Sequence, residues 1–417
     1  MHIVMFGDQH IESLGGAQVS MRLQRRFLEK AGHTVTVVAP AMHGVRGDLF
    51  MDGAYVDMPS VPITPDREYS LTWPSRRNDR WVDAALAARP RADVVHIQAD
   101  FWGAFIGHRF AARHQLPVVH TMHNRVDVGI AATAPFPALV LRVLNAWQRR
   151  VLGVTEPEPA GLDGWAFLRR FALRSDAVTA PSAHFARRLE AHGVVPGGSV
   201  GASRQGARQA PRVDVVWNGI DDEMLADVLS DAPRERESGR PRFVWLGRMS
   251  PEKRLLPFLA ALAASGADAE VEIIGDGAER RAAERFVAKR GLEGAVTFSG
   301  KLPYAQVLRR IAAADAVVQT SIGFETQGMT VFEAASLGTP SIVCDPDIGT
   351  ELGSGYWAVA ETARTARTVS ALAGALRVAA AEIAAGTPVK VAADVREKFR
   401  QSSRTAAMVE VYERVTG

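Results

Sequence analysis

Two glutamates, Glu325 and Glu333, lie eight residues apart in the stretch GFETQGMTVFEAASLGTP. The preceding run AVVQTS is typical of a strand, and VFEAASLG of a helix that ends at Gly338, so residues 322–330 should form the loop between them. Ligands of open parallel sheets bind outside the carboxyl ends of the strands, where such loops gather. We therefore expect Glu325 to face a binding cleft, and Glu333 to lie about one turn into the helix.

Two interpretations of Glu333 are open at this point. Its carboxylate fits a T-x-x-E capping box with Thr330, in which it would bind the start of its own helix. Alternatively, it accepts hydrogen bonds from a ribose diol, while Gly328, Met329 and Thr330 offer backbone N–H groups to a phosphate. The spacing alone is compatible with both interpretations.

Two basic residues lie in the loop that follows another predicted strand. The segment GRMSPEK comes directly after RFVWL and places Arg248 and Lys253 in one loop. Two fixed cations can neutralise a diphosphate and stabilise the negative charge that develops on it as a leaving group. The competing interpretation is a solvated surface loop.

Glycines stand between other predicted strands and the helices that follow them. Gly15 and Gly16 directly precede the first helix, and Gly275 lies between strand and helix in EIIGDGAER. Glycine lets a ligand approach the backbone closely, and a helix start favours an anion. Ordinary turn formation is the competing explanation for each of them.

Alternating strand and helix patterns run along the chain and would position these loops. The strand-like runs are HIVMF, TVTVVAP, DVVHIQ, PVVHTMH and DAVTAPS, then RFVWLG, EVEIIG, VTFSG, AVVQTS and SIVCD. This rhythm predicts an α/β protein with parallel sheets covered on both faces. We expect two doubly wound domains, 1–220 and 221–398, with a mobile loop near 194–212. A terminal helix over 399–417 could pack back on the first domain.

Composition narrows the class of protein. The chain has 417 residues, 47% apolar and 23% charged, and a formal net charge of +3, values typical of a globular protein of more than one domain. The small net charge without a basic stripe argues against a nucleic-acid partner. Its single cysteine, Cys344, excludes an internal disulfide. The start MHIVMF lacks a signal-peptide pattern and no apolar run reaches membrane-spanning length, so a cytoplasmic location is expected.

Taken together, these residues resemble the retaining glycosyltransferases of family 4. The markers follow the order of that family along nearly the whole chain: GGA at 15–17, TMH ending at His123, APS at 180–182, WNGID, GRMSPEK, IIGDG, VTFSG and the E-x7-E element from Glu325 to Glu333. The resemblance implies the GT-B fold, in which two Rossmann-like doubly wound domains face a central cleft and bind a nucleotide-sugar between them. The first domain would bind the acceptor and the second the donor.

The resemblance also implies a role for each marker residue. Arg248 and Lys253 would bind the donor diphosphate, Glu333 the ribose hydroxyls and Glu325 the transferred sugar. Backbone contacts would come from the glycine loops and the helix start, namely Gly15, Gly16, Gly275, Gly328, Met329 and Thr330. His123 would lie beside the sugar on the acceptor side, whereas His120 fits a packed strand histidine better.

The implied reaction is transfer of a hexose, glucose or mannose, from UDP or GDP to an acceptor hydroxyl. No carboxylate is well placed as a covalent nucleophile, so retention would follow the same-face route proposed for the family. No paired-aspartate metal motif stands at a matching position, and neither a metal ion nor a cofactor beyond the donor is expected. A nucleotide-sugar 2-epimerase is the competing enzyme class, and a non-catalytic sugar-nucleotide-binding subunit the competing non-enzyme; the presence of Arg248, Lys253 and Glu325 argues against both.

Two departures from the family pattern bear on these expectations. Arg254 stands where a glycine usually follows the loop lysine, which leaves the path of that loop open. The usual EGFG is replaced by ETQG at 325–328, a spelling similar to the subgroup that glucosylates diacylglycerol and related lipids.

The acceptor is therefore expected to be a membrane lipid or lipid-linked glycan, with a soluble metabolite or glycan as the alternative. The segment APFPALVLRVLNAWQRRVLG could form an amphipathic basic helix on the inner face of an anionic membrane, with Phe136, Leu139, Val143 and Trp147 on its apolar side. A core helix of the first domain with exposed arginines is the other interpretation.

Overall fold

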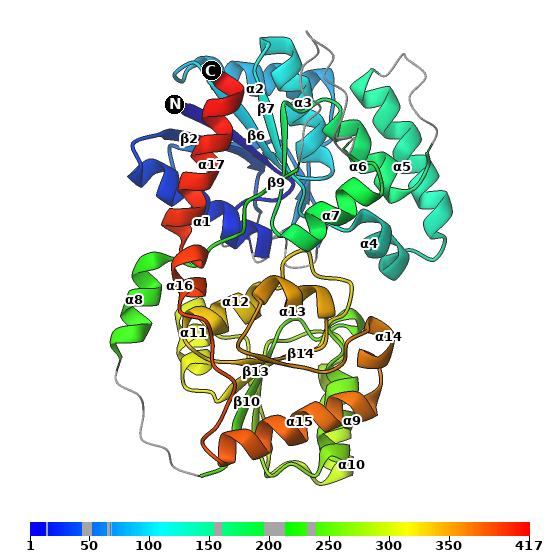
Figure 1. Ribbon diagram of the computed structural model, residues 1–417. Helices are drawn as coiled ribbons and strands as arrows, with labels where there is room; N and C mark the ends of the chain where they lie inside the picture. The colour runs from blue at the N-terminus through cyan, green and yellow to red at the C-terminus, as the bar shows by residue number, and fades with distance from the viewer. Residues whose placement is uncertain are drawn as a thin grey trace, which may run out of the picture. The chain divides into compact units, whose positions relative to one another are not determined.

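The computed structural model describes residues 1–13, 16–43, 52–64, 67, 69–153, 161–195, 213–231 and 239–417. The described residues divide into two compact units (Figure 1), the first formed by Met1–Gly219 with Arg404–Gly417 and the second by Ile220–Ser403. Gly15 and most of the predicted loop 194–212 lie outside the described residues.

The first unit is built on a parallel sheet with the strand order β3-β2-β1-β6-β7-β8-β9. Central strands such as β1 are buried along their whole length, which is why they read as continuous apolar runs. The strands are β1 His2–Gly7, β2 Thr34–Pro40, β3 Tyr55–Met58, β6 Val94–Gln98, β7 Val118–Thr121, β8 Ala177–Ala180 and β9 Val213–Val215, with a separate antiparallel pair β4 Val61–Pro62 and β5 Ser70–Leu71.

Helices connect these strands, and several begin at a residue whose side chain caps the first turn. Ser75 caps α2, Asp163 caps α6, and Ser182, from the APS marker, caps α7 by accepting from the N–H of Phe185 at 3.1 Å. The helices of this unit are α1 Gly16–Lys30, α2 Arg76–Ala87, α3 Trp102–His114, α4 Val126–Thr133, α5 Pro137–Leu152, α6 Gly164–Ala172 and α7 Ala183–Ala191.

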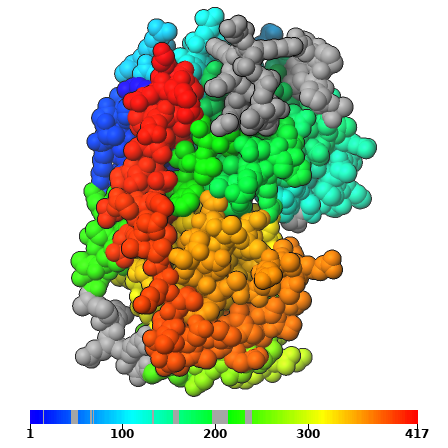
Figure 2. Space-filling view, viewed as in Figure 1, coloured from blue at the N-terminus to red at the C-terminus, as the bar shows by residue number. Residues whose placement is uncertain are grey.

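The last helix, α17 (Gln401–Thr416), belongs for most of its length to the first unit. Met408 and Val411 pack in one apolar cluster with Ile3 of β1, and Figure 2 shows α17, in red, against the blue N-terminal residues. The hydroxyl of Tyr412, which is 0% exposed, forms a hydrogen bond of 2.6 Å with Nδ1 of His96 in β6. The C-terminal helix therefore forms part of the hydrophobic core of the first unit.

The second unit has a parallel sheet with the order β12-β11-β10-β13-β14-β15. The winding reverses at β10, which pairs with β11 on one side and with β13 on the other. Such a reversal is the place where open α/β sheets bind ligands. The strands are β10 Arg242–Leu246, β11 Glu270–Ile274, β12 Val296–Gly300, β13 Ala316–Gln319, β14 Ser341–Val343 and β15 Tyr356–Ala358.

Helices of the second unit include α9 and α15, which pack on each other beside the sheet (Figure 1). Asp221 caps α8 by accepting from the N–H groups of Glu223 and Met224. The bounds are α8 Asp222–Ser230, α9 Leu255–Ser265, α10 Arg280–Arg290, α11 Tyr304–Ala312, α12 Met329–Ser336, α13 Pro346–Leu352, α14 Ala363–Ala366, α15 Val369–Ala384 and α16 Asp394–Phe399, with a 3-10 turn at Pro251–Lys253. The predicted fold class, two α/β units with parallel sheets, is confirmed.

Within the described parts of the chain, none of the helices has the length and apolar character needed to cross a bilayer.

Candidate functional site

The loops after β10 and β13 meet at the point where the sheet of the second unit reverses its winding. Lys253 lies in the first loop and Glu325 in the second, and the ammonium Nζ of Lys253 donates to Oε1 of Glu325. The side chains of this ion pair are 24% and 18% exposed. The structure thus brings together two of the residues that the sequence singled out, one for a diphosphate and one for a sugar.

Two buried side chains, Trp245 and Thr320, hold the backbone of the loop that carries Lys253. The indole Nε1 of Trp245 donates to Oγ1 of Thr320 at 2.9 Å, and that hydroxyl in turn donates to the carbonyl of Lys253. Because Trp245 and Thr320 are buried, the position of the Lys253 backbone is set by the core of the unit.

Arg254, the departure from the family pattern, adopts the backbone conformation that a glycine would favour. Its φ of 58° and ψ of 40° are left-handed, so the loop turns there as it would at glycine. The guanidinium donates to the carbonyls of Thr320 at 3.1 Å and Arg367 at 2.8 Å. These bonds join Arg254 to the loop after β13 and to the end of α14, and they offset part of the cost of the left-handed conformation.

The Glu325 loop has anchors of its own. The hydroxyl of Ser321 donates to Oε1 of Glu325 at 2.7 Å, so this oxygen accepts from two side chains. The N–H of Gly323 donates to Oδ2 of Asp345 at 2.7 Å, and Asp345 is buried at the start of α13. The carboxylate is therefore held on a constrained loop.

Arg248 lies in the same loop as Lys253 but makes a different contact. Its Nη2 donates to Oε1 of Glu252 at 3.2 Å, and its side chain is 67% exposed. The structure places Arg248 near the predicted site without bringing it into the Lys253–Glu325 pair.

Glu333 is buried inside α12, where it accepts a hydrogen bond of 2.6 Å from the hydroxyl of Tyr304. The capping-box interpretation is wrong: α12 begins at Met329 with Gly328 as its N-cap, and no side chain caps this helix. Gly328 has a φ of 79°, a left-handed conformation that explains why a glycine stands there. Met329 and Thr330 are the first two residues of the helix, where N–H groups lack acceptors within the helix.

Burial raises the pKa of the Glu333 carboxyl, and the hydrogen bond from Tyr304 acts in the opposite direction. Burial and the nearby Glu333 carboxylate raise the pKa of the Tyr304 hydroxyl well above its usual range, so Tyr304 is the donor in this bond.

The structure gives Gly275 a packing role. A Cβ at this position would lie 2.0 Å from the carbonyl oxygen of Gly247, so only glycine allows the loops after β10 and β11 to touch. The predicted contact of Gly275 with a ligand stays a prediction. Gly16, the first residue of α1 in the other unit, has nothing within 4 Å of the place where a Cβ would stand.

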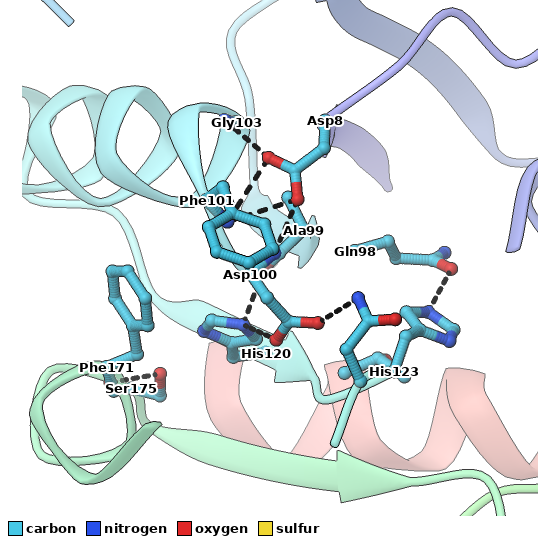
Figure 3. A network of polar contacts seen from close by, with 12 residues as sticks. Asp8, Gln98, Ala99, Asp100, Phe101, Gly103, His120, His123, Phe171 and Ser175 are labelled. Carbon is cyan, nitrogen blue, oxygen red and sulfur yellow. Dashed lines mark hydrogen bonds and ion pairs between the residues drawn. The ribbon is translucent and has the colours of Figure 1, made fainter. Parts of the chain in front are cut away.

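A second group of polar residues lies at the carboxyl ends of β1, β6 and β7 in the first unit (Figure 3). The Nε2–H of His123 donates to Oε1 of Gln98 at 3.1 Å, and Oδ2 of Asp100 accepts from the amide of Asn124 at 2.7 Å. His120 is 0% exposed and donates from Nε2 to the carbonyl of Ala99 at 2.8 Å, in keeping with a packed strand histidine.

Asp8 caps the start of α3 from the neighbouring strand. Its carboxylate accepts from the N–H groups of Asp100, Phe101 and Gly103, with the shortest of these bonds at 2.8 Å (Figure 3). Burial and the Asp100 carboxylate raise the pKa of Asp8 to about 7, against the effect of the three N–H donors. Burial lowers the pKa of His123 to about 4, so its imidazole is neutral at neutral pH.

The sequence analysis missed Asp8, Asp100 and Tyr304. Asp8 and Asp100 follow β1 and β6 even more closely than Glu325 follows β13, so inspecting the residues after each predicted strand could have found them. Tyr304 opens a helix and gives no comparable signal, because its contact with Glu333 depends on how α11 packs on α12. Among the described residues, no group of three or more histidine, cysteine or acidic side chains is arranged to hold a metal ion.

Each of the two units contains a region that matches a known protein family. Residues 14–200 match the family described as Glycosyltransferase Family 4, and residues 230–352 match Glycosyl transferases group 1. The chain is a GT-B glycosyltransferase of group 1. The two regions of this glycosyltransferase that match lie in the first and second units, respectively.

Similar sequences and structures agree with this family. The glycosyltransferase is 23% identical to alpha-monoglucosyldiacylglycerol synthase of Streptococcus pneumoniae, covering 82% of this chain and 70% of that protein. It is 26% identical to 2-deoxystreptamine glucosyltransferase of Streptomyces kanamyceticus, covering 84% and 88%.

Its fold is that of HepE from Anabaena in complex with UDP and glucose, with a TM-score of 0.66 at 15% identity over 99% of this chain and 100% of that one. Sucrose-phosphate synthase from Thermosynechococcus elongatus gives a TM-score of 0.67 at 18% identity, covering 99% and 98%.

Proposed function

We propose that this glycosyltransferase moves a hexose, glucose or mannose, from UDP or GDP to an acceptor hydroxyl with retention of the anomeric configuration. The observation that carries the proposal is the contact of Lys253 with Glu325 at the reversal point of the second sheet. In a nucleotide-sugar the diphosphate and the sugar are directly bonded, so a cation for one and a carboxylate for the other must be neighbours. The second unit then binds the donor.

In the proposed reaction the acceptor oxygen bonds to the anomeric carbon on the face from which the diphosphate departs. The bond from the anomeric carbon to the diphosphate oxygen breaks, and the acceptor proton passes to that leaving oxygen. Lys253 and Arg248 stabilise the charge that develops on the diphosphate, and Glu325 accepts hydrogen bonds from the sugar hydroxyls. The protein supplies position and charge, and no side chain is required as a general base.

The first unit binds the acceptor in this proposal. His123, neutral and oriented by Gln98, offers a hydrogen-bonding imidazole at the carboxyl edge of the sheet. The exposed Asn124, held by the buried Asp100, adds an amide that can bind a hydroxyl.

A lipid acceptor at an anionic membrane is supported by an unusual helix in the first unit. Three large apolar side chains of α5 are exposed: Phe136, at its N-cap, is 70% exposed, Leu139 58% and Val143 60%. Trp147 faces inward, against Phe105 at 4.6 Å between ring centroids. The sequence-based interpretation of a surface helix therefore fits three of the four predicted residues.

The inner face of α5 combines apolar side chains, such as Leu141 and Leu144, that pack against the core with two buried polar ones. Asn145 and Gln148 are both 0% exposed and accept hydrogen bonds from the buried guanidinium of Arg170. These contacts fix the orientation of the helix and leave Phe136, Leu139 and Val143 exposed, and exposed apolar side chains that lie together fit a partner surface. Because α5 carries three arginines and no acidic residue, an anionic lipid surface is the partner that its charge fits.

The named relatives support two acceptor classes. The Streptococcus pneumoniae relative is named for the product monoglucosyldiacylglycerol, a lipid, and the Streptomyces kanamyceticus relative for glucosyl transfer involving 2-deoxystreptamine. The exposed face of α5 favours the lipid, and transfer to a soluble metabolite or glycan is the second candidate.

The function is tested by incubating the purified protein with UDP- and GDP-hexoses, with and without vesicles that contain diacylglycerol and phosphatidylglycerol. We expect one donor to raise the melting temperature, vesicles to raise turnover, and the product to keep the α configuration by NMR. Turnover is expected to persist in EDTA, because Arg248 and Lys253 meet the diphosphate charge. An inverted product, or no donor that is bound or consumed, would contradict the proposal.

The membrane contact has its own test in vesicle co-sedimentation. The double variant L139Q/V143Q should bind vesicles with phosphatidylglycerol at least about tenfold more weakly, since each buried apolar side chain contributes about 1.5–3 kcal/mol. Val378→Gln, at a position in α15 of the second unit that is 49% exposed, is the matched control. Equal binding of the double variant and the control would favour the soluble acceptor.

A further inference from the structure

The contact between Tyr304 and Glu333 joins two helices of the second unit. Tyr304 is the first residue of α11, and Glu333 lies in the middle of α12, which contacts α11. The phenolic hydroxyl donates to Oε1 of the carboxylate at 2.6 Å, a short bond of the charge-assisted type. Glu333 is 4% exposed, so its position is set by packing.

The Glu333 carboxylate accepts its side-chain hydrogen bond at one oxygen, Oε1. A carboxylate can accept about four hydrogen bonds, yet among the described residues Tyr304 is the one side chain that donates to it. A hydrogen bond to a charged group contributes about 1.5–3 kcal/mol, so a further donor to this carboxylate would add to binding. The second oxygen of Glu333 can therefore accept from a ligand hydroxyl.

The environment of the two side chains keeps Tyr304 protonated as the hydrogen-bond donor and Glu333 as the acceptor. Burial raises the pKa of the Glu333 carboxyl, whereas the hydrogen bond from Tyr304 favours its ionised form. The other charged group that acts on Tyr304 is Asp221, the N-cap of α8, and it too raises the pKa of the phenol. Tyr304 thus stays protonated across the physiological range and can act as a fixed donor.

We propose that Tyr304 is a positioning residue for nucleotide binding: its hydroxyl fixes Oε1 of Glu333 and leaves Oε2 to accept from the ribose 2′-hydroxyl of the donor. Tyr304 does not touch the reacting atoms and acts through Glu333. The inference rests on the proposed function, because it assumes that Glu333 binds the ribose of a nucleoside diphosphate.

The test compares the affinities of UDP and GDP with those of their 2′-deoxy forms, by calorimetry between pH 5.5 and 8.5. For the wild type we expect the ribose form of the preferred nucleotide to bind about tenfold more tightly, the order expected for one hydrogen bond to a charged group. Glu333→Gln should lose most of this preference. Tyr304→Phe should also reduce the preference severalfold, and should move the loss of affinity on acidification to a higher pH.

Tyr356→Phe, in β15 of the same unit, is the matched control and should keep the wild-type preference and pH profile. The proposal is overturned if Tyr304→Phe binds the ribose and deoxyribose forms with the wild-type ratio, or weakens both equally as a structural defect would. Failure of the wild type to bind either nucleotide, or to prefer ribose, would instead overturn the proposed donor site itself. Loss of the preference in Glu333→Gln but not in Tyr304→Phe refutes this inference and leaves the proposed function standing.

Discussion

The ammonium of Lys253 and the carboxylate of Glu325 form an ion pair and neutralise each other. A nucleotide-sugar would have to divide this pair, since the proposed function assigns the cation to the diphosphate and the carboxylate to the sugar. Because the two charges are opposite, the pair has almost no net charge. Removing either residue leaves the charge of the other without this partner, which is the basis of the next two predictions.

Glu325→Ala should lower the rate of sugar transfer about 100-fold, the order expected when one or two hydrogen bonds to a charged group are lost. Affinity for free UDP or GDP should stay the same or rise by as much as about fivefold, because Lys253 is released from a partly exposed ion pair. Initial rates and calorimetry measure the two effects. Glu293→Ala, an exposed glutamate of the same unit, is the control. An equal loss of affinity for the nucleotide and the nucleotide-sugar would rule out the assignment of Glu325 to the sugar.

Lys253→Ala should weaken the binding of a nucleoside diphosphate at least about tenfold, while the free nucleoside binds as before, because the lost interaction is with phosphate. Competition experiments with UDP against uridine, and GDP against guanosine, measure this difference. Lys289→Ala removes an exposed lysine at the end of α10 and should change neither affinity. Unchanged diphosphate binding in Lys253→Ala would count against the proposed site.

Arg254→Ala and Arg254→Gly should differ in stability although both remove the same guanidinium. Each variant loses the bonds to the carbonyls of Thr320 and Arg367, but the alanine must keep a left-handed φ that glycine adopts without strain. The glycine variant should be more stable by about 1 kcal/mol. Urea denaturation of the two variants measures this difference, and an alanine variant as stable as the glycine variant would show that the loop relaxes.

Asp8→Asn should change how the stability of the first unit depends on pH. The pKa of Asp8 is about 7 in the folded protein against a reference value of 3.8, so the folded state holds more protons between these values. The contribution of the protonated group is present below about pH 3.8 and is lost as the pH rises to about 7. Relative to the asparagine variant, the wild type should lose up to about 1.4 kcal/mol per pH unit in that window.

Urea denaturation at pH 5 and pH 8 checks this expectation. The control is Asp268→Asn, at a side chain that is 81% exposed, and it should show a constant difference from the wild type. A constant difference for Asp8→Asn as well would mean that the three N–H donors of α3 outweigh burial.

The fold class could be predicted because its signals are local. Continuous apolar runs mark the buried parallel strands, and helical patterns lie between them, so two α/β domains follow from spacing alone. The loops that carry Lys253 and Glu325 could be predicted for the same reason, since each follows a strand. The contact between their side chains depends on β10 and β13 being neighbours, which the order of strands along the chain does not reveal.

Other features depend on packing that sequence patterns do not carry. The T-x-x-E pattern at Thr330 and Glu333 was ambiguous, and the left-handed Gly328 decided against a capping box by starting the helix earlier. On α5, Trp147 has the same periodicity as the exposed apolar residues, yet it turns inward because Trp73 and Phe105 pack against it.

The hydrogen bond between Tyr412 and His96 has a consequence for how this protein can be divided. The chain leaves the first unit at Gly219 and re-enters it at Arg404, so the first unit is encoded by two separate stretches of the sequence. A fragment that stops at residue 219 would expose the apolar surface that Met408, Val411 and Tyr412 cover. Rejoining the last fourteen residues to residue 219 through a short linker would restore that cover, whereas the second unit, residues 220–403, is one continuous stretch of the chain.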